Sequence, residues 1–490
     1  MRWTVNERRG PIQRSAFRSA SLLTGSGSAR NPIAGLAVIG IGASLAPLDF
    51  AVNVAFPAIT AAFALQTRGI RWVAVAYVLT YAALMLSCGR LGDLIGYRRV
   101  FRAGLIVGAL AFVMCALAPS FEWLLAARVA QGVSAALVLS CAPALALGLV
   151  EDGRRTWALG IYASMGGAAG VAAPLLGGAS IAWLGWAGVF WFRAPIALLA
   201  LALLPLLPPD KPRAPAAGGF DPGSALLLAG GLALLLLAPA LPEPGARLGP
   251  ALAAALAGLA LLMLFARGQR RAERPILPRR IAGRADFVLP NIASSVVHCA
   301  SFAIPLLVPY FLIRVAAWGP LASGLLLATW ALGFMAGSAF APVAVRRLGV
   351  RAAAFTAGLI VAGGLGGVAA WPAAPPVGLM IATLFAQGVG LGLFQVAYTD
   401  RVVAALPPQD RGVAGSLAMF TRTIGIVAGA SAFTWAMQVF EATHAAAGAG
   451  SAAAFQAAFG TVQGLAGLAT GGFFVLTCFK RGIWFGAVAR

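Results

Sequence analysis

Residues 33–57 read IAGLAVIGIGASLAPLDFAVNVAFP, and this stretch decides the class of fold. As an α-helix rising about 1.5 Å per residue, it is long enough to cross about 30 Å of membrane hydrocarbon. Its only charged residue is Asp49, and it lacks the regular polar–apolar alternation of a barrel strand. The stretch is therefore predicted to be a transmembrane helix.

The rest of the 490-residue chain has the same character. It is 60% hydrophobic and only 10% charged, with a mean hydropathy of +0.89, whereas soluble domains are roughly 25% charged. We therefore predict an all-α polytopic membrane protein with fourteen spans. Their ranges are 33–57, 70–88, 100–118, 122–149, 158–182, 186–207, 222–241, 249–266, 286–313, 320–345, 350–371, 376–399, 412–438 and 456–479.

The basic residues predict the orientation of these spans. A net charge of +22 would suggest nucleic-acid binding in a soluble protein, but here the charges lie in short loops between apolar stretches. If both termini are cytoplasmic, nearly all Lys and Arg fall on the cytoplasmic side, as in proteins of the inner or plasma membrane. We expect this location and no nucleic-acid partner. The basic residues left outside are Arg68, Arg71, Arg247 and Arg314.

Changes in composition divide the chain into five parts. A basic tail over 1–32 is expected to be disordered and cytoplasmic, and 480–490 form a second cytoplasmic tail. Between them we expect two six-helix bundles, joined by a linker that carries two extra spans. The bundles cover 33–207 and 286–479, and the linker covers 208–285 with spans 222–241 and 249–266.

Two short loops indicate that the halves are related. Residues 89–99 read GRLGDLIGYRR, and residues 342–351 read PVAVRRLGVR, which resembles a degraded copy. Transporters are often built from two similar halves. The two extra spans are rich in Leu and Ala with almost no polar residue, so we expect them to face lipid.

Asp49 and Arg128 are charged residues that lie inside predicted spans. Each is costly in hydrocarbon unless it is paired or hydrated, and a carboxyl can also be neutralised by a proton. We expect Arg128 to need a carboxylate, carbonyl oxygens or water, with Asp49 and Gln131 as candidate partners. Asn53 and Phe56 follow Asp49 along the same helix. The alternatives are a local cap at Asp49 and a purely structural Arg128.

Two glycine-containing patterns concern conformation rather than charge. The loop over 89–101 allows a tight turn, an acidic residue that can meet a neighbouring helix N-terminus, and arginines at the membrane surface. Its candidate latch residues are Gly89, Asp93, Gly96, Arg98 and Arg99. The span over 158–182 carries the second pattern, which consists of Gly160, Pro174, Gly177 and Gly178.

Together these four patterns resemble the major facilitator superfamily, and within it the fourteen-span drug:proton antiporters. The resemblance covers the first half in the right order and implies two six-helix halves plus two central helices. It implies that Asp49 and Arg128 couple transport to protons. It also implies that the loop over 89–99 latches one conformation and that the pattern in 158–182 is the antiporter motif.

The chain departs from this family at several positions. Leu94 replaces a basic residue of the loop, and Ala169 and Ala173 replace glycines of the antiporter motif. Arg193 stands where the family usually carries asparagine. It could bind an anionic substrate group, pair with a carboxylate, or reach the membrane surface, and the sequence does not rank these.

The second half is less specific. His298 could titrate, although a hydrogen-bonded structural role is the simpler interpretation. Trp330 and Gln387 are suited to line a cavity. The candidate substrate-cavity residues are therefore Asn53, Phe56, Gln131, Arg193, Trp330 and Gln387.

No pattern for bond-breaking chemistry is present in the sequence. It has no phosphate-binding GxxxxGK[ST] loop, and its five cysteines show no CxxC spacing, so we expect neither an enzyme nor a cofactor or metal. We predict a monomeric secondary transporter that exports small amphipathic compounds or drugs in exchange for protons by alternating access. The alternatives are a transporter of one specific metabolite, or a receptor or scaffold on the same fold.

Overall fold

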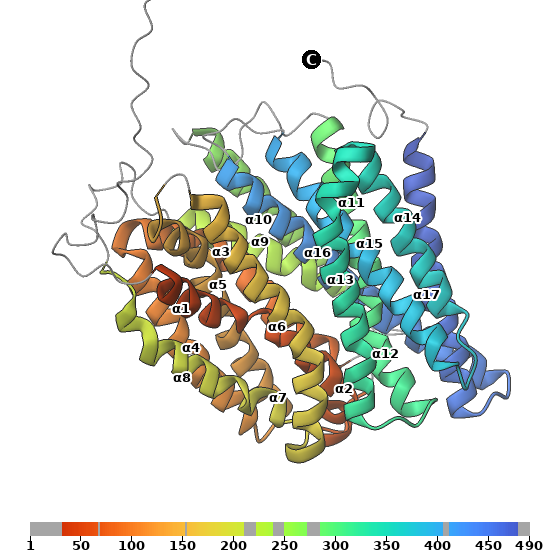
Figure 1. Ribbon diagram of the computed structural model, residues 1–490. Helices are drawn as coiled ribbons and strands as arrows, with labels where there is room; N and C mark the ends of the chain where they lie inside the picture. Colours follow the sequence, from red (N-terminus) through yellow and green to blue (C-terminus); the bar gives the residue numbers. More distant parts are fainter. Residues whose placement is uncertain are drawn as a thin grey trace, which may run out of the picture.

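The computed structural model describes residues 32–66, 69–151, 154–209, 222–238, 249–271, 285–404 and 411–478, and the structural statements below refer to these residues. The predicted tails at 1–32 and 480–490 lie outside this set except for Pro32, as do parts of the predicted linker. The described residues form a set of packed helices (Figure 1).

The helices before residue 210 form what we call the first bundle. They are α1 (Pro32–Ser44), η1 (Pro47–Asp49), α2 (Phe50–Ala62), α3 (Arg71–Ile95), α4 (Tyr97–Ala116), α5 (Phe121–Gly148), α6 (Arg155–Leu184), α7 (Gly188–Trp191), α8 (Arg193–Leu203) and η3 (Leu204–Leu206).

The helices after residue 284 form the second bundle, and two helices lie between the bundles in sequence. The second bundle consists of α11 (Ala285–Ser301), α12 (Ala303–Arg314), α13 (Pro320–Leu348), α14 (Val350–Ala369), α15 (Val377–Ala404), α16 (Arg411–Ala446) and α17 (Ser451–Cys478). The two intervening helices are α9 (Pro222–Leu237) and α10 (Gly249–Arg271). In Figure 1 the two bundles lie side by side, with α6 and α13 between them.

Within the described residues, 12 helical segments are long and apolar enough to cross a membrane. The chain is therefore a multi-pass membrane protein, but the predicted count of fourteen is not confirmed. The segments expected at 70–88 and 222–241 correspond to α3 and α9, whose described apolar stretches are shorter, Arg71–Met85 and Leu226–Leu235.

Helix α10 is the most exposed of the candidate spans. Only 11% of its 18-residue apolar stretch is buried inside the protein, compared with at least 39% of the corresponding stretch in each of the other candidate spans. It packs against α9, which in turn lies against α3. This placement agrees with the expectation that the two extra helices face lipid.

Three predicted spans are interrupted, which the sequence analysis did not anticipate. Breaks separate α1 from α2, α7 from α8, and α11 from α12. Each break lies within one turn before a proline, namely Pro47, Pro195 and Pro305. A proline lacks the backbone N–H and its ring clashes with the carbonyl one turn earlier, which kinks or breaks a helix.

The two similar loops adopt the same turn. Gly96 joins α3 to α4 with φ at +103°, and Gly349 joins α13 to α14 with φ at +81°. These φ values favour glycine because a side chain would clash with its own backbone. The tight turn predicted within residues 89–99 is confirmed at Gly96, but the predicted loop is shorter than expected because residues 89–95 continue α3. The similarity to residues 342–351 extends to the backbone geometry of the turn. We call this side of the molecule the Gly96 end.

The two bundles contact each other away from the Gly96 end. A Cβ atom added to Gly178 of α6 would lie 2.7 Å from the Pro320 carbonyl oxygen of α13, so the two helices touch through their backbones. Near the ends of α2 and α12, Thr60 Oγ1 lies 2.5 Å from the Tyr310 hydroxyl. This side of the bundle interface is therefore closed.

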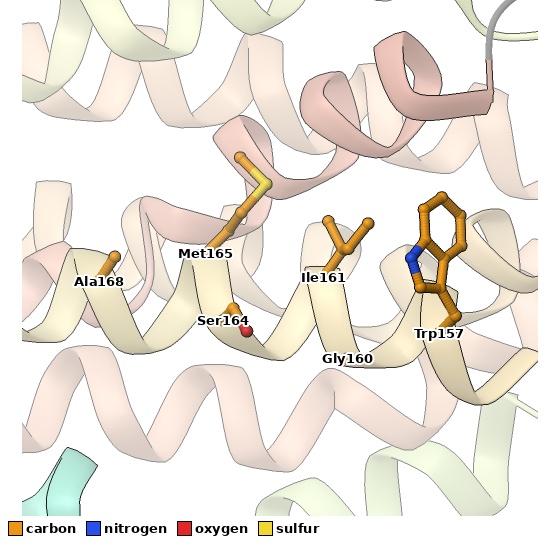
Figure 2. Close-up of a pocket in the computed structure, with 6 residues that line it drawn as sticks. All are labelled: Trp157, Gly160, Ile161, Ser164, Met165 and Ala168. Carbon is orange, nitrogen blue, oxygen red and sulfur yellow. The ribbon is translucent and has the colours of Figure 1, made fainter. Parts of the chain in front are cut away.

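Nearer the Gly96 end, α6 does not pack against the second bundle. Cβ atoms added to Gly160, Gly166 or Gly170 would meet no described atom within 4 Å. An open groove of about 490 Å³ runs along this half of α6, and Figure 2 shows Trp157 and Met165 projecting from one side of the helix. Along α6, the contact with the second bundle is thus closed at one end and open at the other.

Candidate functional site

Asp49 lies at the break in the first span. It ends η1 and precedes Phe50, the first residue of α2, and its side chain makes no hydrogen bond that caps this helix. The positive end of the α2 dipole favours a carboxylate at this position. Since the cap proposed as an alternative is absent from the described structure, both carboxylate oxygens are available to other groups.

Arg128 of α5 binds Asp49 with both ends of its guanidinium group. Its Nη1 and Nη2 atoms donate to Asp49 Oδ1 at 2.6 Å and Oδ2 at 2.8 Å. Nη1 also donates to Gln131 Oε1 at 2.6 Å, and Nε donates to the Val73 carbonyl at 2.9 Å. The partners predicted for Arg128, which were a carboxylate, a carbonyl and Gln131, are confirmed. Such two-pronged pairing is the strongest form of a charged hydrogen bond.

Arg193, the first residue of α8, reaches the same carboxylate. Its Nη1 donates to Asp49 Oδ1 at 2.6 Å, and its Nε donates to the Val189 carbonyl at 2.8 Å. The guanidinium lies 4.8 Å from the Phe112 ring centroid and 5.2 Å from that of Phe190. Of the three alternatives for Arg193, the structure shows pairing with a carboxylate. A surface position is wrong, because this side chain is fully buried.

We call Asp49, Arg128 and Arg193 the arginine–aspartate triad. The exposed fraction of the side chain is 14% for Asp49, 1% for Arg128 and 0% for Arg193. Among the described residues Asp49 is the only acidic group within 4.0 Å of either arginine. Two guanidinium groups and one carboxylate leave one net positive charge in a buried site.

The energetics of this excess charge are unfavourable. Burying an ion costs several kcal/mol even after relaxation of the protein. Contacts with aromatic rings return only about 0.5–2 kcal/mol, so the rings of Phe112 and Phe190 do not offset that cost alone. Arg193 Nη2 is also buried without a hydrogen-bond partner among the described residues, which adds roughly 1–3 kcal/mol.

The remaining cavity candidates of the first bundle lie around the triad. Gln131 is buried and occupied by Arg128, whereas Asn53, one turn along α2, is partly exposed. Phe56 is fully buried, and its carbonyl oxygen lies 3.4 Å from the Tyr310 hydroxyl of the second bundle. Of these residues, only Asn53 retains exposed surface for a cargo in this conformation.

Trp330 and Gln387 lie together in the second bundle. Trp330 Nε1 donates to Gln387 Oε1, and Gln387 Nε2 donates to Ser301 Oγ at 2.9 Å. The Trp330 ring also packs edge-on against Phe50, with ring centroids 5.8 Å apart. Because Phe50 follows Asp49 directly, this contact connects the triad to the second bundle.

A second polar cluster in the second bundle was only partly foreseen. His298 Nε2 lies 2.9 Å from Gln395 Oε1, and the Tyr398 hydroxyl donates to Asn291 Oδ1 at 2.9 Å and lies 2.8 Å from Thr421 Oγ1. His298 could be identified from the sequence as a residue that could titrate, but its partners could not. Polar residues at 291, 294, 295 and 298 follow helical spacing and could have indicated this face of α11.

The structure shows the surroundings of most of the predicted latch residues. Arg98 Nη2 donates to the Leu204 carbonyl at 3.3 Å, and Arg99 is exposed at the Gly96 end. A Cβ atom added to Gly89 would lie 3.8 Å from Ser140 Cβ. The side chain of Asp93 lies outside the described residues, so its predicted role as a latch stays a prediction.

The antiporter motif splits into two parts on α6. Pro174, Gly177 and Gly178 lie where the helix meets its neighbours, and an added Cβ on Gly177 would be 3.0 Å from the Ala51 Cα of α2. Gly160 lies in the open half of the same helix. The motif therefore spans the boundary between the closed and open parts of the interface.

Comparison with known proteins places this geometry in context. Residues 35–430 match the sequence pattern of the Major Facilitator Superfamily. The puromycin resistance protein pur8 of Streptomyces alboniger is 31% identical, over 80% of this chain and 79% of its own length. The riboflavin transporter RibZ of Clostridioides difficile is 25% identical, over 81% of this chain and 87% of its own.

The fold also resembles solved structures. A bacterial homolog of the human lysosomal transporter Spinster, in an inward-facing and occupied conformation, superposes with a TM-score of 0.66. It covers 93% of this chain and 98% of its own, at 17% identity. At that identity the similarity concerns the fold alone.

Proposed function

The chain belongs to the major facilitator superfamily, and we propose that it exports small amphipathic compounds in exchange for protons. The observation that carries this proposal is the buried ion pair between Asp49 and Arg128 at a broken membrane helix. Charged groups inside a membrane are costly and mark ion or substrate pathways. The family assignment indicates a transporter and not an enzyme.

Proton exchange at Asp49 would change the packing of three helices. The carboxylate joins the start of α2 to α5 through Arg128 and to α8 through Arg193. A proton on Asp49 removes its charge and weakens both links. Because Asp49 is the only member of the triad with more than 1% exposure, it is the member that protons can reach.

The bundle interface supports alternating access. Contacts between the bundles close the end away from Gly96, whereas α6 is unpacked nearer the Gly96 end. With both termini cytoplasmic, as we propose from the basic residues, the Gly96 end faces the cytoplasm and this conformation opens inward. Rocking of the bundles about the triad would then expose the site to the other side.

We further propose that α3 and α9 also cross the membrane, giving fourteen spans in a monomer of the cell membrane. Helix α3 extends over Arg71–Ile95, about 37 Å at 1.5 Å per residue, and it packs along α5. The two bundles and the linker predicted from composition then correspond to residues 33–207, 286–479 and 208–285.

The relatives bear on the cargo. The name of pur8 connects it with puromycin resistance, which favours an amphipathic foreign compound. RibZ is named as a riboflavin transporter, and it favours the second candidate, transport of one specific metabolite. A receptor or scaffold on the same fold has no comparable observation behind it and would not require the triad.

The test is proton movement that depends on cargo in proteoliposomes. A panel of amphipathic compounds, including puromycin and riboflavin, is added to vesicles that contain wild type or Asp49→Asn. We expect the wild type to move protons with at least one compound and the variant to move none. Puromycin as the active compound supports drug export, and riboflavin alone supports the metabolite alternative.

Two results would contradict the proposal. If no compound moves protons through the wild type, the exchange with protons is wrong. If Asp49→Asn moves cargo with unchanged dependence on the proton gradient, the role of Asp49 is wrong. Glu441→Gln serves as a matched control, because it also converts a carboxylate to an amide but lies in a partly exposed ion pair.

A further inference from the structure

We infer that the triad binds a monoanionic group against Arg193 Nη2. The group comes either from a free inorganic anion or from an acid group on the cargo. The second source rests on the proposed transport function, whereas the first does not. The inference concerns Arg193, at which this chain departs from the asparagine usual in the resembling family.

The first argument is charge. Arg128 and Arg193 share the single carboxylate of Asp49, and no second acidic group of the described chain lies within 4.0 Å of them. The site therefore holds one positive charge more than it neutralises, in a place where both guanidinium groups are buried. A monoanion next to Arg193 restores neutrality.

The second argument is hydrogen bonding. Arg193 uses Nη1 for Asp49 and Nε for the Val189 carbonyl. Its third nitrogen, Nη2, is fully buried and has no acceptor in the described part of the chain. Buried guanidinium N–H groups are normally satisfied. The orphan donor and the excess charge thus lie on the same side chain, and one anionic acceptor satisfies both.

The third argument is space. A small cavity of about 10 Å³ is lined in part by Tyr77, Phe112 and Gln131, which contact the triad, whereas Arg193 itself does not line it. Phe112 lies under the Arg193 guanidinium, Tyr77 lies under that of Arg128, and Gln131 binds Arg128. Such a volume holds about one particle of the size of water. A halide is larger than a water molecule, so the side chains around the cavity must move apart to admit one, and a cargo carboxylate would instead approach past the partly exposed Asp49.

The test for a free anion measures thermal unfolding of the purified full-length protein in detergent. Sodium chloride is compared with sodium gluconate at equal ionic strength. We expect chloride to raise the wild-type Tm by roughly 3 °C, since a ligand that binds only the folded state stabilises it. Arg193→Asn should lose this rise, and Arg193→Lys, which keeps the charge, should retain part of it.

A matched control variant and a crystallographic measurement complete the test for a free anion. Arg314→Gln removes a positive charge from a partly exposed ion pair with Glu441, and its response to chloride should equal that of the wild type. Crystals grown in sodium bromide should show an anomalous peak within hydrogen-bond distance of Arg193 Nη2.

A second arm tests the cargo as the source. Sodium 4-phenylbutyrate is compared with the neutral 4-phenylbutyramide in the same unfolding assay. If the acid group binds Arg193, the acid should act at a concentration about tenfold lower than the amide, which corresponds to about 1.4 kcal/mol. Arg193→Asn should then respond equally to both compounds.

The two assays distinguish a free anion from an acid group on the cargo. A chloride response lost in Arg193→Asn supports a free anion, and a preference for the acid lost in that variant supports the cargo. The inference is overturned if the wild type shows neither response, or if either response persists unchanged in Arg193→Asn. These readouts need no transport, so their failure is distinct from a failure of the proton-movement assay.

Discussion

The first membrane helix of each bundle is broken, but the side chains at the two breaks differ in charge. In the first bundle, the break between α1 and α2 carries Asp49, which two buried arginines hold through ionic hydrogen bonds. In the second, Ser301 ends α11 at the corresponding break and accepts a neutral hydrogen bond from Gln387. The charge of the first site changes when one proton binds, and the second site has no such response.

This difference suggests a division of labour between related halves. The ionic links of the first bundle can respond to protons, whereas the corresponding groups of the second bundle, on Gln387, Trp330 and Ser301, are uncharged. The edge-on contact between Phe50 and Trp330 joins the two regions. Variants of the ionic site should therefore affect both stability and proton movement, whereas variants of the neutral site should affect stability alone.

The largest effect is expected for Asp49→Asn. The amide leaves Arg128 and Arg193 buried without a countercharge, and breaking a buried ion pair costs about 3–5 kcal/mol. The free energy of unfolding in detergent should fall by that amount, and proton movement should be lost. A loss no greater than that of the control Glu441→Gln would show that the triad is not a buried ionic site.

Gly178→Leu comes next, because it acts on the contact between the bundles. A side chain at this position collides with the backbone of α13 at Pro320, and overpacking of this kind costs about 1–3 kcal/mol. The closed end should open, raising the accessibility of a cysteine placed at Thr60 to a thiol reagent.

The matched control for this prediction is Gly166→Leu on the same helix. An added Cβ at Gly166 meets no described atom within 4 Å, so the accessibility at position 60 should not change. Equal behaviour of the two variants would mean that α6 and α13 do not form the closed contact.

Gln387→Leu tests the neutral side of the comparison. It leaves the Trp330 indole N–H and the Ser301 hydroxyl without their partner, at a cost of about 1–2 kcal/mol. Unfolding should occur at lower denaturant concentration, but proton movement should persist because no charge is changed. Abolished proton movement in a folded variant would contradict the division between the bundles.

The smallest effect is expected for Arg314→Gln. Its ion pair with Glu441 is 2.7 Å long, but the two side chains are 33% and 26% exposed. Solvent screens such pairs, which contribute about 0–1 kcal/mol. Stability and proton movement should stay close to wild type, and a loss as large as that of Asp49→Asn would remove the distinction between buried and exposed pairs.

Part of the site could be predicted from single residues. A charged group inside a span needs a partner, and this cost alone identified Asp49 and Gln131 as candidates for Arg128. The turn at Gly96 followed in the same way from the local pattern. Arg193 could not be resolved, because its three alternatives depend on how deeply the start of α8 lies in the bundle and on which groups of other helices meet it there.

The breaks in the spans were missed although their cause is local. Pro47, Pro195 and Pro305 are visible in the sequence, yet prolines also occur inside continuous helices here, such as Pro143 and Pro174. Whether a proline bends or interrupts a membrane helix depends on the neighbouring helices that satisfy the freed backbone groups. The hydrogen bond between Trp330 and Gln387 was unpredicted for a similar reason, since it joins helices distant in sequence.

Local features of the amino-acid sequence were enough to predict a multi-pass helical membrane protein, to identify two similar loops, and to show that Asp49 and Arg128 need partners. These conclusions depend on hydrophobic length, glycine geometry and the cost of charge in hydrocarbon, which act within one segment. The packing of the helices was needed to show that a second arginine shares the carboxylate and that the bundles close at one end. Those features depend on the faces that packed helices present to each other, which no single segment specifies.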